Sequence, residues 1–351
     1  MIPIILIIVG LIVLICFMIN RQRDGNAKVV FTKNLGKDEI FRIGDEICKT
    51  SELMVFLTTA QGQYERVYDE KIWTTQLDGV TLADSVKETV LEKVAQIKTM
   101  YLLAKSRGIS LDDAEKECAI AAAKDYLEHV SAEQREQLGF SEEMLTSLYE
   151  EYALANKVYQ DIIRDINPEI SDDEARIVTV QHILIRTYER DADGNRVDFM
   201  TADKQKAYEK ACSIWTEATS GEKSFEELAS RYSDDNNITY SFGKGEMEEA
   251  FETAAFQLGT DEISPVVEGE SGYHIIKCIS TFDKDETAEN KKKILEQRRE
   301  EAFGQEYNEF VDTLARKLNQ SAWDEVALLP GGQMPDADFF ATYSRFFGQA
   351  Q

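Results

Sequence analysis

Two short stretches, far apart in the chain, decide the fold of its second half: Val180-Gln181-His182-Ile183-Leu184-Ile185 and Ser271-Gly272-Tyr273-His274-Ile275-Ile276-Lys277. Both are rich in β-branched residues and alternate with the period of two that is typical of strands. Each stretch places a histidine in its alternating run, and the whole chain has three histidines. We therefore expect two neighbouring strands that bring His182 and His274 together as a polar pair.

Three further motifs lie between these stretches. They are Phe225–Asp235 (Phe-Glu-Glu-Leu-Ala-Ser-Arg-Tyr-Ser-Asp-Asp), Phe242–Met247 (Phe-Gly-Lys-Gly-Glu-Met) and Phe251–Phe256 (Phe-Glu-Thr-Ala-Ala-Phe). In this order, the five segments resemble the parvulin family of peptidyl-prolyl isomerases over residues 176–281. The resemblance implies a small antiparallel sheet flanked by helices and an enzyme that isomerises X-Pro peptide bonds. It implies no cofactor and no metal.

The resemblance also assigns roles to individual positions. The implied substrate-binding residues, which match the proline pocket of the family, are Phe242, Met247 and Phe251. The implied catalytic residues are His182, Asp235, Ser271 and His274. The four-residue spacing of Met247 and Phe251 predicts that both lie on one helical face. Apart from the family, such a spacing is typical of a core, and a buried histidine pair is typical of a structural hydrogen bond.

One segment departs from the family pattern. Parvulins usually carry a longer, glycine-containing loop between the Asp/Cys position and the following aromatic residue, whereas here only residues 236–241 separate Asp235 from Phe242. Thr239 stands at the place of the pocket leucine, with Ile238 as a substitute. A shortened pocket wall favours a second hypothesis, in which the domain binds clients as a holdase and does not catalyse isomerisation.

The net charge of the chain argues against one class of partner, the nucleic acids. Its formal net charge is −26 over 351 residues, and 30% of the residues are charged. Such a surface repels phosphate backbones, so we expect no nucleic-acid binding. The expected partners are unfolded or partly folded proline-containing polypeptides and, through the N-terminus, a membrane.

Residues 2–19 form an apolar run with the length of a short transmembrane span. We expect residues 1–20 to be an uncleaved N-terminal membrane anchor and residues 21–37 to be a linker. The positive-inside rule places the side carrying Arg21 and Arg23 in the cytoplasm. The family resemblance places the body outside it, and we adopt this extracytoplasmic orientation.

The five cysteines are scattered without metal-ligand or redox spacing, which predicts separate reduced thiols.

The acidic run Asp191–Asn195 departs from the pattern of a calcium-binding loop, because its glycine is misplaced and no glutamate follows at the required distance. We expect a hairpin tip or solvated loop there.

Helical periodicity organises the remainder of the chain. It predicts helices over residues 81–104, 111–130 and 142–165 after a short strand and turn near residues 39–46, and a long helix from residue 286 to residue 318. We therefore expect a helical chaperone-like domain at residues 38–170, the parvulin-like domain at 176–281 and a C-terminal helix at 284–320 that packs on the helical domain. This layout is similar to that of the SurA- and PrsA-like extracytoplasmic foldases.

The last segment, residues 321–351, carries an aromatic face formed by Phe339, Phe340, Tyr343, Phe346 and Phe347. This face could pack on the helical domain, occupy a client groove or lie at the membrane surface. We expect it to pack on the helical domain. The sequence as a whole indicates an α+β protein with a mostly helical chaperone-like domain. The expected function is a membrane-anchored isomerase and chaperone for secreted or surface proteins.

Overall fold

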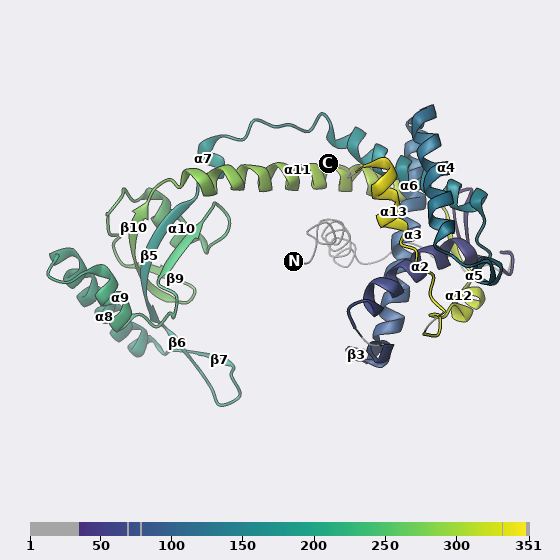
Figure 1. Ribbon diagram of the computed structural model, residues 1–351. Coiled ribbons are helices and arrows are strands. Elements are labelled where there is room, and N and C mark those ends of the chain that lie inside the picture. The colour runs from purple at the N-terminus through teal and green to yellow at the C-terminus, as the bar shows by residue number, and fades with distance from the viewer. Residues whose placement is uncertain (1–34, 69, 78, 332, 349–351) are drawn as a thin grey trace. The chain divides into compact units, whose positions relative to one another are not determined.

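The computed structural model describes residues 35–68, 70–77, 79–331 and 333–348 (Figure 1). The chain divides into two compact units. A helical unit contains the described residues up to Ile166 and those from Arg299 onward, and a sheet unit contains Asn167–Arg298. The longest helix, α11 (Lys284–Asp312), contributes to both. The chain is thus mostly helical with small antiparallel sheets, which confirms the predicted α+β class.

The sheet unit is built on a four-stranded antiparallel sheet with the order β8-β5-β10-β9. Its strands are β5 (Val178–Arg186), β8 (Thr239–Phe242), β9 (Val267–Gly269) and β10 (Gly272–Ser280). The other elements of the unit are α7 (Asp172–Ala175), the hairpin of β6 (Tyr188–Arg190) and β7 (Arg196–Asp198), α8 (Thr201–Ser220), α9 (Phe225–Tyr232) and α10 (Glu249–Gln257).

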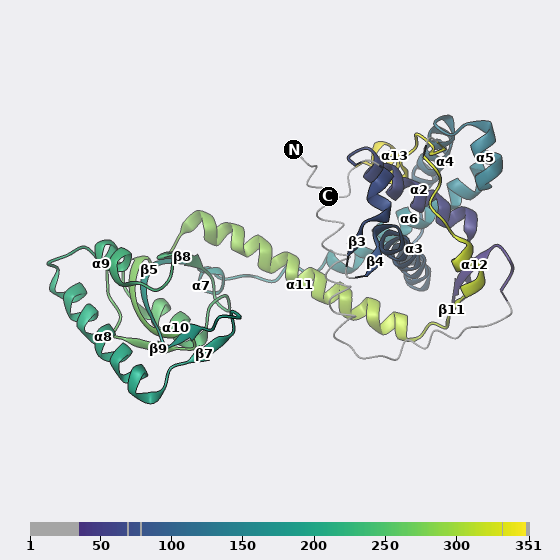
Figure 2. The same cartoon turned by 90° about the horizontal axis from the view of Figure 1, so that it is seen from below.

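Each face of this sheet packs on a different group of helices (Figure 2). Because side chains alternate along a strand, Ile183 and Ile185 point to the face that α8 and α9 cover. Val178 and Val180 point to the opposite face, where α10 packs. The two histidines share this second face, which therefore carries both polar and apolar groups.

The helical unit has one hydrophobic core. Its first elements are β1 (Glu39–Ile43), β2 (Glu46–Lys49), α2 (Thr50–Glu65), the 3₁₀ helix η1 (Glu70–Thr74), β3 (Gln76–Leu77), β4 (Val80–Thr81), α3 (Leu82–Ser106), α4 (Asp113–Glu128), α5 (Ala132–Leu138) and α6 (Glu142–Ile163). Local capping sets several of these boundaries. Thr81 caps α3 by accepting a hydrogen bond from the Asp84 N–H, and Gly108 follows the helix end with a φ of 72°.

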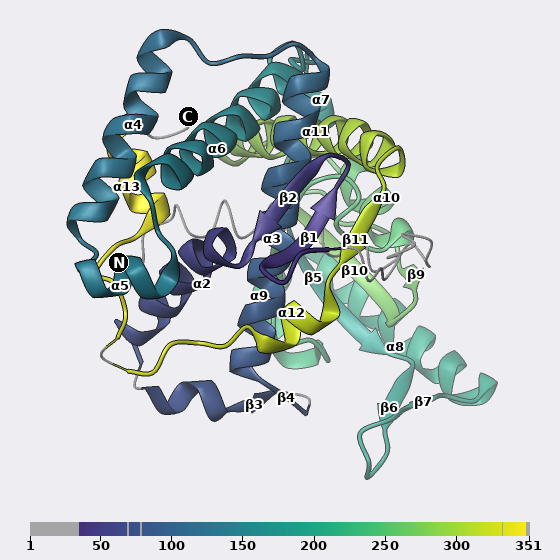
Figure 3. The ribbon, with the colours of Figure 1, turned by 90° about the vertical axis from the view of Figure 1, so that its right-hand side faces the viewer.

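The C-terminal elements return to this core. They are the end of α11, β11 (Arg316–Leu318), α12 (Gln320–Glu325) and α13 (Phe339–Phe347). The predicted helix over residues 284–320 ends earlier than expected, because the chain leaves α11 after Asp312 and β11 pairs with β1. Figure 3 shows the resulting three-stranded sheet, with β1 between β2 and β11.

A buried ion triad joins three helices of the helical unit. Lys98 on α3 is 2% exposed, and its Nζ lies 2.8 Å from Glu151 Oε2 on α6 and 2.9 Å from Glu52 Oε2 on α2. Burial alone lowers the pKa of Lys98, but the two carboxylates outweigh it and raise that pKa. Burial raises the pKa of Glu151 to about 7 despite the attraction of Lys98. The single cation therefore compensates two carboxylates in a low-dielectric site.

The aromatic tail packs on the protein itself, as predicted. Phe339 is fully buried, and its ring stacks on Tyr149 at 4.3 Å between centroids and contacts Phe56 at 4.7 Å. Its backbone N–H donates to Thr59 Oγ1 at 3.1 Å. Helix α13 is thus an integral part of the helical core.

Other predictions can be compared directly with the structure. The predicted anchor at residues 1–20 lies outside the described residues, and none of the helices in the described ranges has the length and apolarity of a membrane span. Four cysteines, Cys48, Cys118, Cys212 and Cys278, are free thiols. Asp191 begins the tip of the β6–β7 hairpin, where its Oδ1 accepts from the Asn195 N–H at 2.8 Å.

Replacing Lys98 by methionine is expected to destabilise the helical unit by about 3 kcal/mol, because Glu52 and Glu151 then share a buried site without a cation. Urea unfolding followed by circular dichroism measures the change. Lys105→Met is the matched control, since Lys105 forms an exposed ion pair with Glu46, and such pairs contribute about 1 kcal/mol or less. Equal losses in both variants would contradict a structural role for the triad.

Replacing Phe339 by alanine is expected to cost about 3 kcal/mol or more, because it removes a fully buried ring from the helical core. Thermal unfolding measures the effect. Ser344→Ala on the exposed side of α13 is the control and leaves the melting temperature within a degree or two of the unmodified chain. An unchanged melting temperature in Phe339→Ala would show that α13 is not part of the core.

Candidate isomerase site

Strand register brings the two sequence-predicted histidines together. His182 on β5 pairs with Ile276, and His274 on β10 pairs with Leu184, so the histidines are diagonal neighbours on one face. Their Nδ1 atoms lie 3.3 Å apart, and the side chains are 3% and 5% exposed. The sheet therefore holds both imidazoles in fixed positions out of contact with bulk water.

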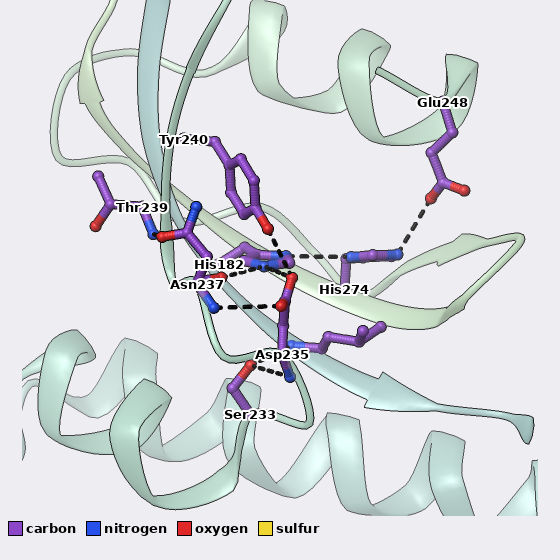
Figure 4. A network of polar contacts seen from close by, with 9 residues as sticks. His182, Ser233, Asp235, Asn237, Thr239, Tyr240, Glu248 and His274 are labelled. Carbon is purple, nitrogen blue, oxygen red and sulfur yellow. Dashed lines mark hydrogen bonds and ion pairs between the residues drawn. The ribbon is translucent and has the colours of Figure 1, made fainter. Parts of the chain in front are cut away.

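The chain segment after α9 delivers a carboxylate to this pair. The Asp234 N–H donates to the Leu184 carbonyl at 2.8 Å, and the Asp234 carboxylate accepts from the Arg186 N–H at 2.9 Å. This anchor on β5 places the next residue, Asp235, with its Oδ2 3.1 Å from His182 Nε2 (Figure 4). His182 Nε2 also lies 3.2 Å from the Asn237 carbonyl oxygen.

Several donors fix the Asp235 carboxylate. The Tyr240 hydroxyl donates to Oδ2 at 2.9 Å, and the Asn237 N–H donates to Oδ1 at 3.2 Å. Partial burial acts to raise the pKa of Asp235, but the hydrogen bonds from Tyr240, Asn237 and His182 outweigh it, and the pKa lies below its ordinary value. Asp235 is therefore ionised at neutral pH.

Burial acts in the opposite sense on the histidines. It lowers the pKa of His182, against the attraction of Asp235. Burial and the neighbouring His182 lower the pKa of His274 to about 4. Two neutral imidazoles thus lie beside an ionised carboxylate, an arrangement that orients groups and leaves one negative charge at the edge of the cluster.

An aromatic group covers the imidazoles. The ring of Phe251 on α10 lies 5.4 Å from the His182 ring and 5.2 Å from the His274 ring, both nearly perpendicular. Phe242 lies 5.8 Å from Phe251, and both phenylalanines are nearly inaccessible. Met247 is partly exposed and packs against the same cluster. Of the three predicted substrate-binding residues, Met247 thus has the most accessible side chain.

Contrary to the prediction from its spacing to Phe251, Met247 does not lie on a helical face. Helix α10 begins at Glu249, so Met247 lies in the turn before it and not on the helix. This turn is held by Glu252, whose Oε2 accepts from the Gly245 N–H at 2.7 Å and from the Met247 N–H at 3.4 Å. Met247 reaches the cluster because the turn folds back onto α10.

Ser271 is not part of this polar cluster. It lies in the tight turn between β9 and β10, where its carbonyl faces the Thr187 N–H at 3.4 Å. Within the described part of the chain, no hydrogen bond joins the Ser271 hydroxyl to His182, Asp235 or His274. The seven predicted positions therefore form one cluster of six, with Ser271 separate from it.

In the short segment after Asp235, neither Thr239 nor Ile238 lies at the site, although the sequence predicted both at the pocket wall. Thr239 is exposed at the start of β8, and Ile238 packs with the core on the α8–α9 side of the sheet. Tyr240 takes the position beside the site instead, with its ring 5.2 Å from His182. Its signal in the sequence is strand alternation, because Tyr240 and Phe242 share one face of β8.

Sequence reasoning also missed Glu248. This residue precedes α10, and its Oε1 lies 3.1 Å from His274 Nε2 (Figure 4). A cavity of about 680 Å³ lies elsewhere in the sheet unit and contains none of the predicted site residues; its lining includes Ser241, Glu246 and Lys293.

The antiparallel sheet with its histidine pair, carboxylate and apolar cover is the site expected of a parvulin-type isomerase. The family model for the PPIC-type PPIASE domain, or rotamase, matches residues 182–280. The peptidyl-prolyl cis-trans isomerase Pin1 of Arabidopsis thaliana is 35% identical over 112 residues, which cover 92% of that protein and 28% of this chain. The chain belongs to the parvulin family and carries a peptidyl-prolyl isomerase domain of this type.

Similarity extends beyond the domain in one group of relatives. Foldase protein PrsA of Caldanaerobacter subterraneus is 30% identical over 217 residues, which are 60% of this chain and 62% of that relative. The chain thus spans less than two thirds of that protein. The crystal structure of the peptidylprolyl isomerase PrsA of Bacillus cereus matches 92% of this chain and 99% of its own chain at 18% identity, with a TM-score of 0.36.

Replacing Tyr240 by phenylalanine is expected to raise the pKa of Asp235, because the ionised carboxylate loses its shortest hydrogen bond. The ¹³C chemical shift of the Asp235 carboxyl, followed against pH, measures this change. Tyr208→Phe is the control, since Tyr208 is exposed on α8 and contacts Tyr273. An unchanged Asp235 titration in Tyr240→Phe would show that the hydroxyl does not stabilise the carboxylate.

Proposed function

We propose that this chain is a peptidyl-prolyl isomerase and folding chaperone for secreted or surface proteins. The carrying observation is the Asp235 carboxylate, held by Tyr240 and His182 beside the apolar group of Met247 and Phe251. In this proposal Met247 contacts the proline ring of the substrate, and the buried rings of Phe251 and Phe242 form the apolar floor beneath it. The relatives named foldases and isomerases support the same reading.

The chemistry requires no covalent step. Amide resonance places a barrier of about 18–20 kcal/mol on rotation about the X-Pro bond. The resonance form with a double C–N bond carries negative charge on the carbonyl oxygen. A fixed anion near that oxygen disfavours this form and weakens the double bond, while an apolar ring site excludes water.

Each polar residue has a place in this scheme. Asp235 supplies the anion next to the substrate carbonyl, His182 orients Asp235, and His274 orients His182. The low pKa values of the histidines keep both rings neutral, so they do not cancel the charge of Asp235 at neutral pH. The predicted role of Ser271 stays a prediction, because the structure connects its hydroxyl to none of these groups.

The helical unit has its own core, and we assign client binding to its exposed apolar surface. Tyr64, Val67 and Tyr68, near the end of α2, are 36%, 71% and 55% exposed and offer apolar surface to an unfolded chain. We further propose that residues 1–20 anchor the protein in the cell membrane with its body outside the cytoplasm. The apolar run of residues 2–19 supports the anchor.

The second candidate function is that of a holdase with an inactive isomerase domain. It is favoured by the segment after Asp235, where Ile238 packs away from the site and Thr239 is exposed. A site with this wall missing is able to grip a proline without twisting its peptide bond.

Replacing Met247 by alanine is expected to reduce kcat/KM at least tenfold, because it removes the accessible apolar wall of the site. The assay follows isomerisation of a short Ala-Pro peptide by NMR exchange, with the full chain in mild detergent. Met200→Ala is the matched control, since Met200 is 76% exposed elsewhere in the sheet unit.

A loss confined to Met247→Ala supports the enzyme and its site. Equal activity in both variants contradicts the site. No activity in the folded, unmodified chain contradicts the enzyme and favours the holdase, which suppression of client aggregation by the same preparation then measures.

A further inference from the structure

The polar cluster forms a line of groups with an acceptor at each end. At one end His182 Nε2 faces Asp235 Oδ2 at 3.1 Å and the Asn237 carbonyl at 3.2 Å. In the middle the two Nδ1 atoms face each other at 3.3 Å. At the other end His274 Nε2 faces Glu248 Oε1 at 3.1 Å. The line therefore contains three contacts between polar groups, and the Asp235 and Asn237 oxygens share the first of them.

Each of these contacts requires one hydrogen. Carboxylate and carbonyl oxygens accept, so both outer contacts need a hydrogen on the ring nitrogen or on the acid, and the middle contact needs one between the rings. Two neutral imidazoles carry two N–H groups in total. The cluster is therefore one proton short of three complete hydrogen bonds, whichever tautomers it adopts.

The structure shows which contact lacks its hydrogen bond. Among the residues that the structure describes, neither His274 Nε2 nor Glu248 Oε1 has a hydrogen-bond partner, although both atoms are buried and lie 3.1 Å apart. The Asp235 end, by contrast, is aligned and complete. We therefore infer that the missing hydrogen is the one between His274 and Glu248.

The position of Glu248 is imposed by its surroundings. Its Oε2 accepts from the Glu270 N–H at 2.8 Å. A Cβ atom on Gly269 would lie 1.8 Å from Oε1, so a residue with a side chain at that position would displace the carboxylate. Glu248 precedes α10 but does not cap it with its side chain. The chain therefore directs this carboxylate to the histidine.

The electrostatic surroundings are mostly negative. On the sheet His274 faces His182 from β5, with Asp235 and Tyr240 beyond it, and Glu248 approaches from the start of α10. Glu268 and Glu270 on the neighbouring β9 segment are exposed to solvent. Burial and His182 lower the pKa of His274 to about 4, so this ring alone resists a third proton. The partly exposed Glu248 carboxylate, whose Oε1 contacts this Nε2, favours that proton.

We propose that Glu248 is a positioning residue whose carboxylate accepts a hydrogen bond from Nε2 of His274 once that ring binds one additional proton, which completes the hydrogen-bonded line to Asp235. The proton comes from solvent and leaves as pH rises; no bond other than N–H or O–H forms or breaks. This inference rests on the proposed isomerase function, because it assigns the line a role in holding Asp235 against the substrate carbonyl. The complete line holds His182 and Asp235 more firmly, so kcat/KM rises as the proton binds.

Histidine-selective ¹⁵N NMR of the full chain in mild detergent tests the proposal, since the chain has only three histidines to assign. In the unmodified chain, the Nε2 shift of His274 is expected to titrate between pH 4 and pH 8, and kcat/KM follows the same curve. In Glu248→Gln the amide donates to Nε2 without an extra proton, so both titrations are lost. Glu249→Gln, at the exposed neighbouring position, keeps both.

Titration that persists unchanged in Glu248→Gln, or no titration of His274 in the unmodified chain, overturns the proposal. Gly269→Ala gives a second route to the same loss, because its Cβ displaces the carboxylate. The spectra require no turnover. A chain that titrates as expected but does not isomerise the peptide contradicts the proposed function and leaves the additional proton established.

Discussion

The antiparallel pairing of β5 with β10 is the constraint on which the site depends. The register that places Ile276 opposite His182 also places His274 opposite Leu184, so both imidazoles share one face. A shift by one residue would turn one of them into the apolar core on the α8–α9 side. Asp235 and Glu248 come from separate loops, but each contacts a ring that this pairing holds. The local geometry therefore follows from backbone hydrogen bonds between two strands.

Much of this arrangement could be predicted from sequence because short-range rules govern it. Alternating β-branched residues mark both strands, and helical periodicity over residues 81–104 predicts the helix that the structure shows as α3. The similar patterns of the two strands also predicted that the side chains of His182 and His274 lie close together. Asp235 was predicted through family resemblance, and its contact with His182 depends on the Asp234 anchor to β5, which no local rule shows.

The remaining features depend on long-range packing. Glu248 resembled an ordinary helix-start residue, and its contact with His274 needs the space left by Gly269 on another strand. The segment over residues 316–318 continued a helical pattern but became β11, since β1 offered an edge for pairing. Tyr240 reached the site because the segment after Asp235 is short. In the helical unit, Lys98, Glu52 and Glu151 came together from three helices whose sequence spacing gave no sign of an ion triad.

The central claim is that proline isomerisation occurs at the α10 face of the sheet. One NMR experiment tests it most directly: an Ala-Pro peptide is mixed with the full chain carrying ¹³C-labelled methionine methyl groups, of which there are eight. The account predicts cis–trans exchange peaks of the peptide together with a shift of the Met247 methyl signal, while the exposed Met200 signal stays in place. Exchange without a change at Met247, or a shift confined to methionines of the helical unit, would contradict it.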